Sequence, residues 1–600
     1  MCGIFGFIGE QDVTPILING LKKLEYRGYD SAGICIKHKD TLTVVKKKGR
    51  VKNLLSPEDM ANIQGRIGIA HTRWATHGEP NSVNAHPHQD CTGRMAIVHN
   101  GIIENYDIIK ELLVGEGHII KSDTDTEIIA HLIEKFYSGN LEEAVMEALK
   151  CVEGTYGLAV ISKEEDKIVV ARRGSPIILG LGKNFKIVSS DAVAILEHTK
   201  DVIYLHDEEI AALTPQKIEI YDVNGQAIDK DVEKIRWNIE QIEKKGFKHF
   251  MLKEIFEQPD SIKNVLRGRL KENGVKFSFD LNPSDVERIV IIGCGTSWHA
   301  ALIGKYLIEK HVSVPVEVDY ASEFRYRDIV LREKDLVIFI SQSGETADTL
   351  AALRKVKQYD RVKTFGIVNV VGSTIAREVD MGIYLHAGPE IGVASTKAFT
   401  CQIMALFLLA LHLEARKGKG ISRDIIDEIN FLPAKIESVL KQHEYIKNIA
   451  DKFKGSSNFL YLGRGINFPV ALEGALKLKE VSYIHAEGYP AAEMKHGPIA
   501  LIDENMPVVF IATQGRLFEK VINNMEEVKA RRGIIITITD TESRTLKQLS
   551  HCIIRVPKTI EQLLPIINII PLQLLAYYIA DARGLNVDKP RNLAKSVTVE

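Results

Sequence analysis

Short apolar runs separated by polar turns dominate the first third of the chain. Each is four or five residues long, as strands of a layered domain are, and the clearest lie at 67–70, 95–98, 157–161, 168–171 and 202–205. Apolar residues recur at helical spacing in few places there, most clearly at 125–136. The pattern predicts an α+β layer domain over residues 2–217.

The pattern changes in the middle of the chain. We interpret residues 218–283 as a connector, because a charged helical stretch at 234–258 is broken by Lys-Lys-Gly at 244–246. From residue 284 onward, apolar strands alternate with longer helices, which is typical of an α/β fold with a doubly wound parallel sheet.

The second half of the chain contains an internal repeat. Three strand-and-turn segments recur at an offset of 170 or 171 residues, pairing 290–296 with 460–466, 321–324 with 491–494, and 337–344 with 508–515. We therefore expect two tandem doubly wound parallel α/β domains, at 284–423 and 452–590, and a tail at 591–600. Length alone, at about 150 residues per domain, would give about four domains. The repeat reduces the expected number to three.

Charge and composition exclude several classes of partner. The 77 Lys and Arg residues nearly cancel the 79 Asp and Glu residues, so no net field attracts nucleic acid or an anionic membrane. With 45% hydrophobic residues, the chain can bury substantial cores. We expect small-molecule substrates, with no nucleic acid and no membrane as partners.

The chain shows no pattern for export or membrane insertion. Its strongest apolar run, 403–411, is nine residues ended by His412, about half of what a membrane helix needs, and predicts a buried core helix. The N-terminus lacks a basic region ahead of its apolar stretch. The seven cysteines form no CxxC pair, which argues against disulfides and a structural zinc site. We expect a cytoplasmic location.

Cys2 directly follows the initiator methionine. Removal of Met1 would put the thiol and a free α-amino group on one residue, so that the amine can act as general base for the thiol. From position alone, the alternative is an inert cysteine in an apolar N-terminal strand.

Further segments resemble the glutamine amidotransferases of the N-terminal-nucleophile type, an α+β sandwich fold: Cys2-Gly-Ile-Phe-Gly6, Glu25-Tyr-Arg-Gly-Tyr-Asp-Ser-Ala-Gly33, His71-Thr-Arg-Trp-Ala-Thr-His77, His99-Asn-Gly101 and Ser122-Asp-Thr-Asp-Thr-Glu127. The resemblance implies that Cys2 is the nucleophile, and that Asn100 and Gly101 stabilise the oxyanion. It also implies that Arg73 binds the α-carboxylate of L-glutamine, that Asp125 binds its α-ammonium, and that Trp74 is a gate between two active sites. Thr76 and His77 belong to the same substrate-binding stretch.

A metal site is the rival explanation for this region. Five histidines fall within 29 residues, at positions 71, 77, 86, 88 and 99. No acidic or thiolate ligand follows at a useful spacing. We therefore predict a hydrogen-bonded polar lining and no metal.

A phosphate site is predicted in the first repeat. Gly293-Cys-Gly295 follows a strand, but the third glycine of a dinucleotide fingerprint is replaced by Trp298, and by Phe468 in the second repeat. No ATP-binding loop occurs either. Instead, Ser341-Gln-Ser-Gly-Glu-Thr346 follows the strand 335–340 and opens a helix through residue 353, where hydroxyls and backbone N–H groups suit a phosphate monoester. A plain helix cap is the alternative, and it explains one hydroxyl but not three.

This loop and Gly295-Thr-Ser297 resemble the sugar isomerase domains that bind phosphosugars. The resemblance implies a sugar pocket that also contains the stretch 390–396. The sugar-binding residues it implies are Gly295, Thr296, Ser297, Ser341, Gln342, Ser343, Thr346, Glu390, Val393 and Ala394.

Glu473, Lys477 and Glu480 share one face of a predicted helix at 471–483. By itself such a set is usually a solvated ion-pair stripe, and His496 by itself is usually a loop histidine.

The whole chain, however, resembles the family of glutamine:fructose-6-phosphate aminotransferases (isomerising) of bacterial type, on both halves together with 471–480, 495–498 and the tail 590–600. The resemblance implies formation of D-glucosamine 6-phosphate from D-fructose 6-phosphate and glutamine by internal ammonia transfer, the first step of amino-sugar (UDP-N-acetylglucosamine) synthesis.

The same resemblance implies the roles of the isomerase residues. Lys595 forms a Schiff base with C2 of the sugar, and His496 assists ring opening. Glu480 moves the proton between C1 and C2, and Lys477 helps to manage the sugar hydroxyls or the charge of the enolamine. No cofactor is needed, and a homodimer is implied. His485 is a candidate cross-subunit residue, and core or interface packing explains it equally well.

Two alternatives belong to other classes. An amidotransferase that makes asparagine or phosphoribosylamine would need an ATP-pyrophosphatase loop or an acidic diphosphate loop, and neither occurs. A phosphosugar-sensing regulator would need no N-terminal cysteine and would carry a DNA-binding module, which the near-neutral charge disfavours.

Overall fold

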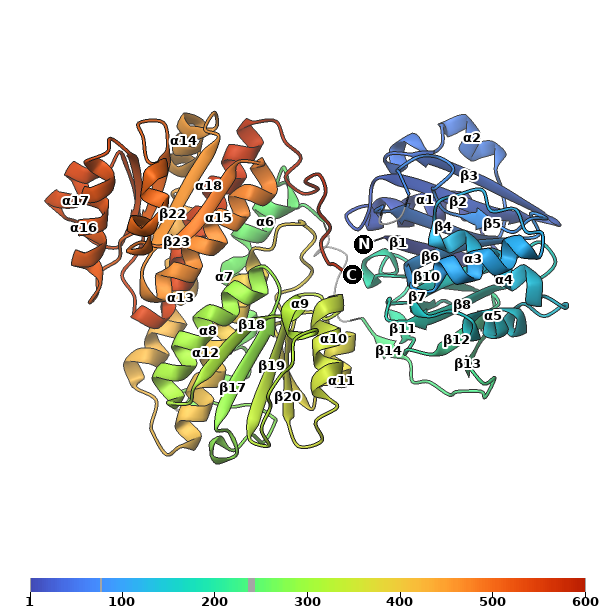
Figure 1. Ribbon diagram of the computed structural model, residues 1–600, viewed down its shortest axis with the longest axis horizontal. Coiled ribbons are helices and arrows are strands. Elements are labelled where there is room, and N and C mark those ends of the chain that lie inside the picture. The colour runs from blue at the N-terminus through green and yellow to red at the C-terminus, as the bar shows by residue number, and fades with distance from the viewer. Residues whose placement is uncertain (1, 76–77, 236–242, 273, 599–600) are drawn as a thin grey trace. The chain divides into compact units, whose positions relative to one another are not determined.

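The structure is a computed structural model that describes residues 2–75, 78–235, 243–272 and 274–598 (Figure 1). The chain divides into two compact units. The first contains Met1–Glu243 and the tail segment Ala594–Glu600, and the second contains Lys244–Leu593.

Two antiparallel sheets form the centre of the first unit (Figure 1). In order across the sheet, the larger consists of β14 (Glu233–Lys234), β11 (Asp201–Tyr204), β9 (Ile178–Leu181), β10 (Phe185–Ser189), β1 (Gly3–Gly9), β4 (Ile67–Arg73), β2 (Ser31–His38) and β3 (Thr41–Lys48). The smaller consists of β13 (Ile218–Asp222), β12 (Glu209–Leu213), β8 (Ile168–Arg173), β7 (Gly154–Ser162), β6 (Met95–Ile103) and β5 (His88–Gln89).

Side-chain alternation along β1 explains why the sheets stack. Phe5 and Phe7 pack into the core under helix α1 (Val13–Leu24), whereas Ile4 and Ile8 join the core between the two sheets. Helices α4 (Asp125–Phe136) and α5 (Leu141–Lys150) cover the outer face of the smaller sheet. The result is the α+β sandwich that the sequence predicted.

The end of this sandwich differs from the predicted boundary at residue 217. Strand β13 pairs along its whole length with β12, and β14 pairs with β11. Strands β13 and β14, which lie within the predicted connector, therefore belong to the sheets of the first unit. The part of the connector after residue 249 belongs to the second unit, because α6 (Phe250–Phe256) and α7 (Gln258–Leu266) bury Met251, Ile255 and Ile262 in its core. Residues 236–242 of the expected helical stretch lie outside the described residues.

The second unit contains two parallel five-stranded sheets (Figure 1). The first is β18 (Val316–Tyr320), β17 (Arg288–Gly293), β19 (Asp335–Ser341), β20 (Lys363–Val368) and β21 (Met381–Tyr384); the second is β23 (His485–Pro490), β22 (Asn458–Gly463), β24 (Pro507–Ile511), β25 (Ile534–Thr539) and β26 (Cys552–Arg555). Both sheets have the strand order 2-1-3-4-5 in chain terms. In such sheets, ligands bind at the carboxyl ends of strands 1 and 3, where the winding direction reverses.

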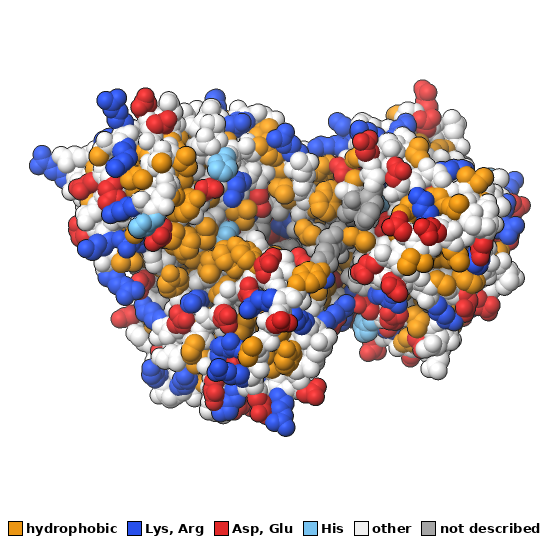
Figure 2. All heavy atoms as spheres, in the orientation of Figure 1, with side chains coloured by type: hydrophobic (Ala, Val, Ile, Leu, Met, Phe, Trp, Pro, Cys, Tyr) orange, Lys and Arg blue, Asp and Glu red, His pale blue; other side chains and the backbone are white. Residues whose placement is uncertain are grey.

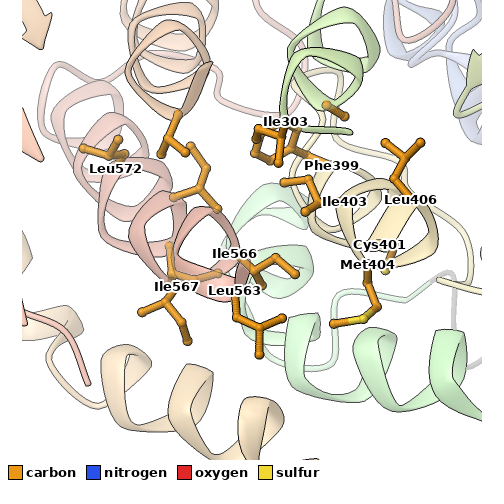
Figure 3. Close-up of a cluster of buried hydrophobic side chains, with 14 of the residues drawn as sticks. Ile303, Phe399, Cys401, Ile403, Met404, Leu406, Leu563, Ile566, Ile567 and Leu572 are labelled. Atoms are coloured by element: carbon orange, nitrogen blue, oxygen red, sulfur yellow. The ribbon is translucent and has the colours of Figure 1, made fainter. Parts of the chain in front are cut away.

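Two long apolar helices form the core between these sheets. Helix α12 (Lys397–Arg416) and the segment Glu561–Ala582, which includes α18 (Leu564–Ala582), are long and apolar enough to cross a membrane, yet 89% and 100% of their apolar windows are buried in the protein. Figure 3 shows their side chains packed together, among them Phe399, Ile403 and Ile566. The predicted core helix is thus confirmed, although it continues past His412, and the sequence analysis missed α18.

On the face shown in Figure 2, Lys and Arg side chains are interspersed with Asp and Glu side chains, and neither sign covers the whole face. This agrees with the near-zero net charge of −2.

Candidate active sites

A cavity in the first unit surrounds Cys2. Cys2 immediately precedes β1, and the neighbouring strands and α4 contribute the other walls. They are Arg73 and Trp74 at the end of β4, His86, His99 to Gly101 in β6, Thr124 to Thr126 at the start of α4, and Thr598 in the tail. Five of the seven predicted glutaminase residues therefore line one cavity together with Cys2. The other two, Thr76 and His77, lie outside the described residues.

The Cys2 thiol lies against the backbone of Trp74. Its Sγ is 3.3 Å from the Trp74 N–H, which donates to it, and 3.4 Å from the Trp74 carbonyl oxygen. Burial raises the pKa of the thiol above its usual range, although the amino terminus, the Trp74 hydrogen bond and Arg73 act in the opposite direction. A thiol that stays protonated at neutral pH needs a base to become a nucleophile, and the α-amino group of a processed Cys2 is suitably placed by covalent structure.

Asn100 and Gly101 lie beside this thiol. The Asn100 Nδ2 donates to the Cys2 carbonyl oxygen at 3.1 Å, and its Oδ1 lies 3.0 Å from the His71 Nε2. Burial lowers the pKa of His71 to about 3, so the ring is neutral, and a proton on Nε2 fixes the Asn100 amide with its NH₂ group toward Cys2. Gly101 has φ +140°, and a Cβ there would clash with the Thr155 carbonyl oxygen, so only glycine fits.

Arg73 and Asp125 supply opposite charges to the same cavity. Both are buried, with 3% and 6% of their surface exposed. Asp125 accepts the Ile103 N–H at 3.0 Å, and Arg73 donates to the Gly78 carbonyl oxygen at 3.2 Å. A fixed guanidinium and a fixed carboxylate in one pocket fit the carboxylate and ammonium groups of an α-amino acid.

The histidines near this cavity form the polar lining that the sequence predicted. His71 stacks on His86 with ring centroids 4.0 Å apart, while His88 and His99 bond to the hydroxyls of Thr124 and Thr126. Burial lowers the pKa of each of these histidines. They are therefore neutral and pack against the loop that begins α4. His77 lies outside the described residues.

The second site lies where the first parallel sheet of the second unit reverses its winding. The loop after β17 contains Gly295 and begins helix α8 (Thr296–Val312), and the loop after β19 contains Ser341 to Thr346 and begins α10 (Ala347–Val356). Because β17 and β19 are neighbours, both loops lie at one edge of the sheet. The sequence prediction for these elements is confirmed to within a few residues.

The hydroxyls of the second loop are partly bonded to each other. Ser341 Oγ lies 2.9 Å from Thr346 Oγ1 and accepts the Gly344 N–H, and Ser343 Oγ accepts the Glu345 N–H. These two N–H groups are used inside the loop, contrary to the expectation of free backbone donors. An anion here would be bound mainly by hydroxyl protons that rotate toward it. Thr346 caps α10 by position, with no side-chain cap bond.

The stretch 390–396 is held by carboxylates. Glu390 accepts the N–H groups of Thr396 and Ala398 and the hydroxyl of Ser395. It therefore shapes the loop at the start of α12, in which Val393 and Ala394 are buried. Glu254, which the sequence analysis missed, accepts the N–H groups at 391 and 392. Ser297 accepts a bond from Gln402 of α12 at 3.0 Å. Gln342 lies in the loop after β19, and its carbonyl oxygen accepts the Asn369 N–H at 3.1 Å.

A buried charge network joins the two repeats. Helix α15 (Phe468–Ser482) packs against α8, and Lys477 lies 3.3 Å from Glu473 Oε1 and 2.5 Å from Glu480 Oε2. Thr296 donates to Glu473 and accepts from Lys477. Glu473 and Lys477 are 0% exposed, so these residues are not a solvated stripe.

The charges in this network are stabilised mutually. Burial acts to lower the pKa of Lys477, but the carboxylates of Glu473 and Glu480 outweigh it and hold this pKa well above its usual range. Lys477 and His299 hold the pKa of Glu473 below its usual value despite burial. His299 Nδ1 lies 2.7 Å from Glu473 Oε2. The sequence analysis missed His299, although it lies one helical turn after Thr296 on α8.

Two further predicted residues, His496 and Lys595, belong to other segments than this network. His496 lies in the short helix Glu493–His496 and is exposed, as is His485. Lys595 belongs to the tail segment that is part of the first unit. The roles of His496 and Lys595 stay predictions.

Comparisons with known proteins match this chain to two domain families and to full-length relatives. The SIS domain family matches residues 284–412 and 452–580, and the glutamine amidotransferase domain family matches residues 57–262. Over their full lengths, the chain is 52% identical to the glutamine–fructose-6-phosphate aminotransferase [isomerizing] of Chlorobaculum tepidum and 50% identical to that of Aquifex aeolicus.

Among solved structures, the chain is similar to the C-terminal domain of glucosamine-fructose-6-phosphate aminotransferase from Francisella tularensis. The TM-score is 0.55 at 40% identity, covering 58% of this chain and 99% of that one.

Proposed function

This chain belongs to the glutamine–fructose-6-phosphate aminotransferase (isomerizing) family, and on that premise we propose that it makes D-glucosamine 6-phosphate and glutamate from D-fructose 6-phosphate and L-glutamine. Two half-reactions are combined. The glutamine residues lie in the first unit, and the sugar residues lie in the second unit except Lys595, which lies in the tail segment of the first. The product supplies amino-sugar (UDP-N-acetylglucosamine) synthesis. The observation that carries the proposal is the cavity in which Cys2, Asn100, Arg73 and Asp125 meet.

In the first half-reaction, Arg73 and Asp125 hold the α-carboxylate and α-ammonium of glutamine. The Cys2 sulfur attacks the amide carbon while the α-amino group takes the thiol proton. The Asn100 NH₂ group and the Gly101 N–H stabilise the oxyanion, and its collapse expels ammonia after the amine returns the proton. Water then cleaves the thioester and releases glutamate.

In the second half-reaction, the loop Ser341–Thr346 binds the phosphate of the sugar, and Thr296 and Ser297 lie at the same sheet edge. His496 assists ring opening, and Lys595 condenses with the C2 ketone and releases water. Ammonia replaces Lys595 on C2. Glu480 then removes a proton from C1 and returns it to C2, which leaves an aldehyde at C1 and an amine at C2. Lys477 holds Glu480 in place at 2.5 Å.

We further propose a homodimer in the reducing cytoplasm. The exposed turn that carries His496 ends at Leu501, an apolar side chain that is 55% exposed, and a partner subunit would cover both. All seven cysteines are free, which suits a reducing compartment. Light scattering of the purified chain tests the dimer, and a monomeric mass under assay conditions would contradict it.

The functional test separates the two half-reactions. Cys2→Ala is expected to abolish glutamine hydrolysis and to leave phosphohexose isomerisation intact, because the Cys2 thiol takes part only in the glutamine half-reaction. Cys151→Ala, at an exposed cysteine of the same unit, is the matched control and should keep both activities. Loss of both activities in a folded Cys2→Ala protein would contradict the two-site proposal.

A further inference from the structure

Four side chains outside both sites converge on one point of the first unit. Cys91 lies in the loop between β5 and β6, and His118 lies in the loop between α3 (Tyr106–Gly115) and α4. His131 and Glu134 lie one turn apart on α4. Their ligand atoms all lie within 4.8 Å of one another. From this geometry we propose that Cys91, His118, His131 and Glu134 form a structural zinc site.

Five of the six distances between these atoms match the edges of a tetrahedron around zinc, and the sixth, between Cys91 and Glu134, is at most 4.8 Å. Cys91 Sγ lies 3.6 and 3.3 Å from the Nδ1 atoms of His118 and His131, and those two nitrogens are 3.4 Å apart. Glu134 Oε2 lies 3.2 and 3.5 Å from the same nitrogens. Tetrahedral zinc with its usual bond lengths requires about 3.3 Å between two nitrogens and about 3.6 Å between sulfur and nitrogen.

Hydrogen bonds alone do not account for this convergence. A proton joins these atoms only in pairs, whereas each Nδ1 lies within 3.6 Å of the other three ligand atoms. One cation at the centre accepts a lone pair from all four. The thiolate and the carboxylate together carry the charge that neutralises a divalent ion. A set of one thiolate, two imidazoles and one carboxylate in tetrahedral arrangement suits zinc best.

The surroundings also resemble the outer shell of a metal site. His131 is 1% exposed, and its other nitrogen, Nε2, faces Glu127 Oε1 at 3.6 Å. A carboxylate behind a ligating imidazole orients the ring and raises its basicity. The Ile119 N–H points at Cys91 Sγ at 3.4 Å, which would stabilise a thiolate. Four protein ligands leave no open position, so the role of the ion is structural.

The site is connected to the glutamine cavity through α4. Glu127 also accepts the backbone N–H groups of Lys121 and Ser122, in the loop that leads to Asp125. The ion would therefore hold three segments together: the β5–β6 loop, the loop before α4, and α4 itself. This proposal departs from the sequence prediction of no metal. The sequence did not indicate the site because residues 91, 118 and 131 are too far apart along the chain to form a recognised ligand spacing.

The test uses the full-length chain after removal of metal with a chelator. Titration with Zn²⁺ against a chromophoric chelator is expected to show about one tight site per chain, and Cys91→Ser to weaken it by more than about 100-fold. Cys151→Ser and His38→Asn, at an exposed cysteine and an exposed histidine of the same unit, are matched controls and should bind Zn²⁺ as the unsubstituted chain does. Glu127→Gln should weaken binding about 10- to 100-fold.

Substitution of the unaltered chain with Co²⁺ tests the proposal without any variant. A tetrahedral site with one thiolate gives intense visible bands and a sulfur-to-cobalt charge-transfer band. Absence of that band, or unchanged Zn²⁺ affinity in folded Cys91→Ser, would overturn the proposal. Metal removal should also raise the KM for glutamine and leave phosphohexose isomerisation unchanged, because Glu127 and α4 connect the ion to the glutamine cavity.

Discussion

The buried lysine of α15 offers a sharp test of how the second unit is stabilised. In Lys477→Met, Glu473 stays fully buried and loses the ammonium group that lies 3.3 Å from its Oε1. At an effective dielectric constant of about 20, Coulomb's law gives about 5 kcal/mol for charges 3.3 Å apart, the Lys477 to Glu473 separation. The desolvation that Lys477 no longer requires offsets part of this. Breaking one side of a buried ion pair typically costs about 3–5 kcal/mol, and we expect that loss here.

The double variant Lys477→Met, Glu473→Gln removes the charge that the single variant strands. Its glutamine amide still bonds to Thr296, and we expect its stability to lie within about 2 kcal/mol of the unsubstituted chain. Hexosamine synthesis should stay low in the double variant, because Glu480 has lost the cation that positions it. Glutamine hydrolysis should be unchanged.

Urea denaturation measures these effects in the second unit alone if its tryptophan is the reporter. The chain has three tryptophans, so Trp74→Phe and Trp237→Phe leave Trp298, which stacks on Tyr320 in the second unit. The result that would refute the reasoning is a double variant less stable than Lys477→Met. The stranded charge would then not be the cause of the loss.

Three further predictions concern the remaining parts of the mechanism. Asn100→Ala should lower kcat for glutamine hydrolysis by about 10²–10³, as loss of an oxyanion donor does, and an unchanged kcat would remove Asn100 from that role. His71 has a pKa of about 3 in the folded protein and about 6.5 when unfolded, so the unfolded chain binds a proton that the folded chain excludes. The contribution of His71 to the free energy of unfolding of the first unit should be constant above pH 6.5 and fall by about 1.4 kcal/mol per pH unit below it. Equal urea midpoints at pH 7 and at about pH 5.5 would contradict this. Lys595→Ala should retain glutamine hydrolysis but fail to be trapped by borohydride with fructose 6-phosphate, and trapping at another lysine would refute the Schiff-base assignment.

The sequence predicted the fold well for elements that bury one face, and for the second unit, where the sequence repeats. The strands at 67–70 and 95–98 and the helix at 125–136 were found because their apolar residues follow the spacing of the buried face. The repeat gave the second unit, since β17 and β22 begin and end 170 residues apart. The boundary at 217 failed because β13 carries a mixed pattern, and only its pairing with β12 shows its place.

Residues of the glutamine cavity could be predicted because each lies in a recognisable motif of its own segment. Cys2, Asn100 and Asp125 come from three such segments, and the structure brings them to one cavity. Thr598 was missed because nothing local to the tail indicates contact with residues near the N-terminus. The four residues of the proposed zinc site were missed for the same reason, since each is ordinary in its own segment.

Transfer of nitrogen from glutamine to sugar is the central claim, and isotope labelling tests it most directly. The chain is supplied with fructose 6-phosphate, glutamine labelled with ¹⁵N at the amide, and a large excess of unlabelled ammonium, without ATP. If ammonia released at Cys2 passes internally to the sugar, the glucosamine 6-phosphate formed carries ¹⁵N. Product whose label is diluted to the level of the ammonium pool, or no hexosamine at all, would contradict the account.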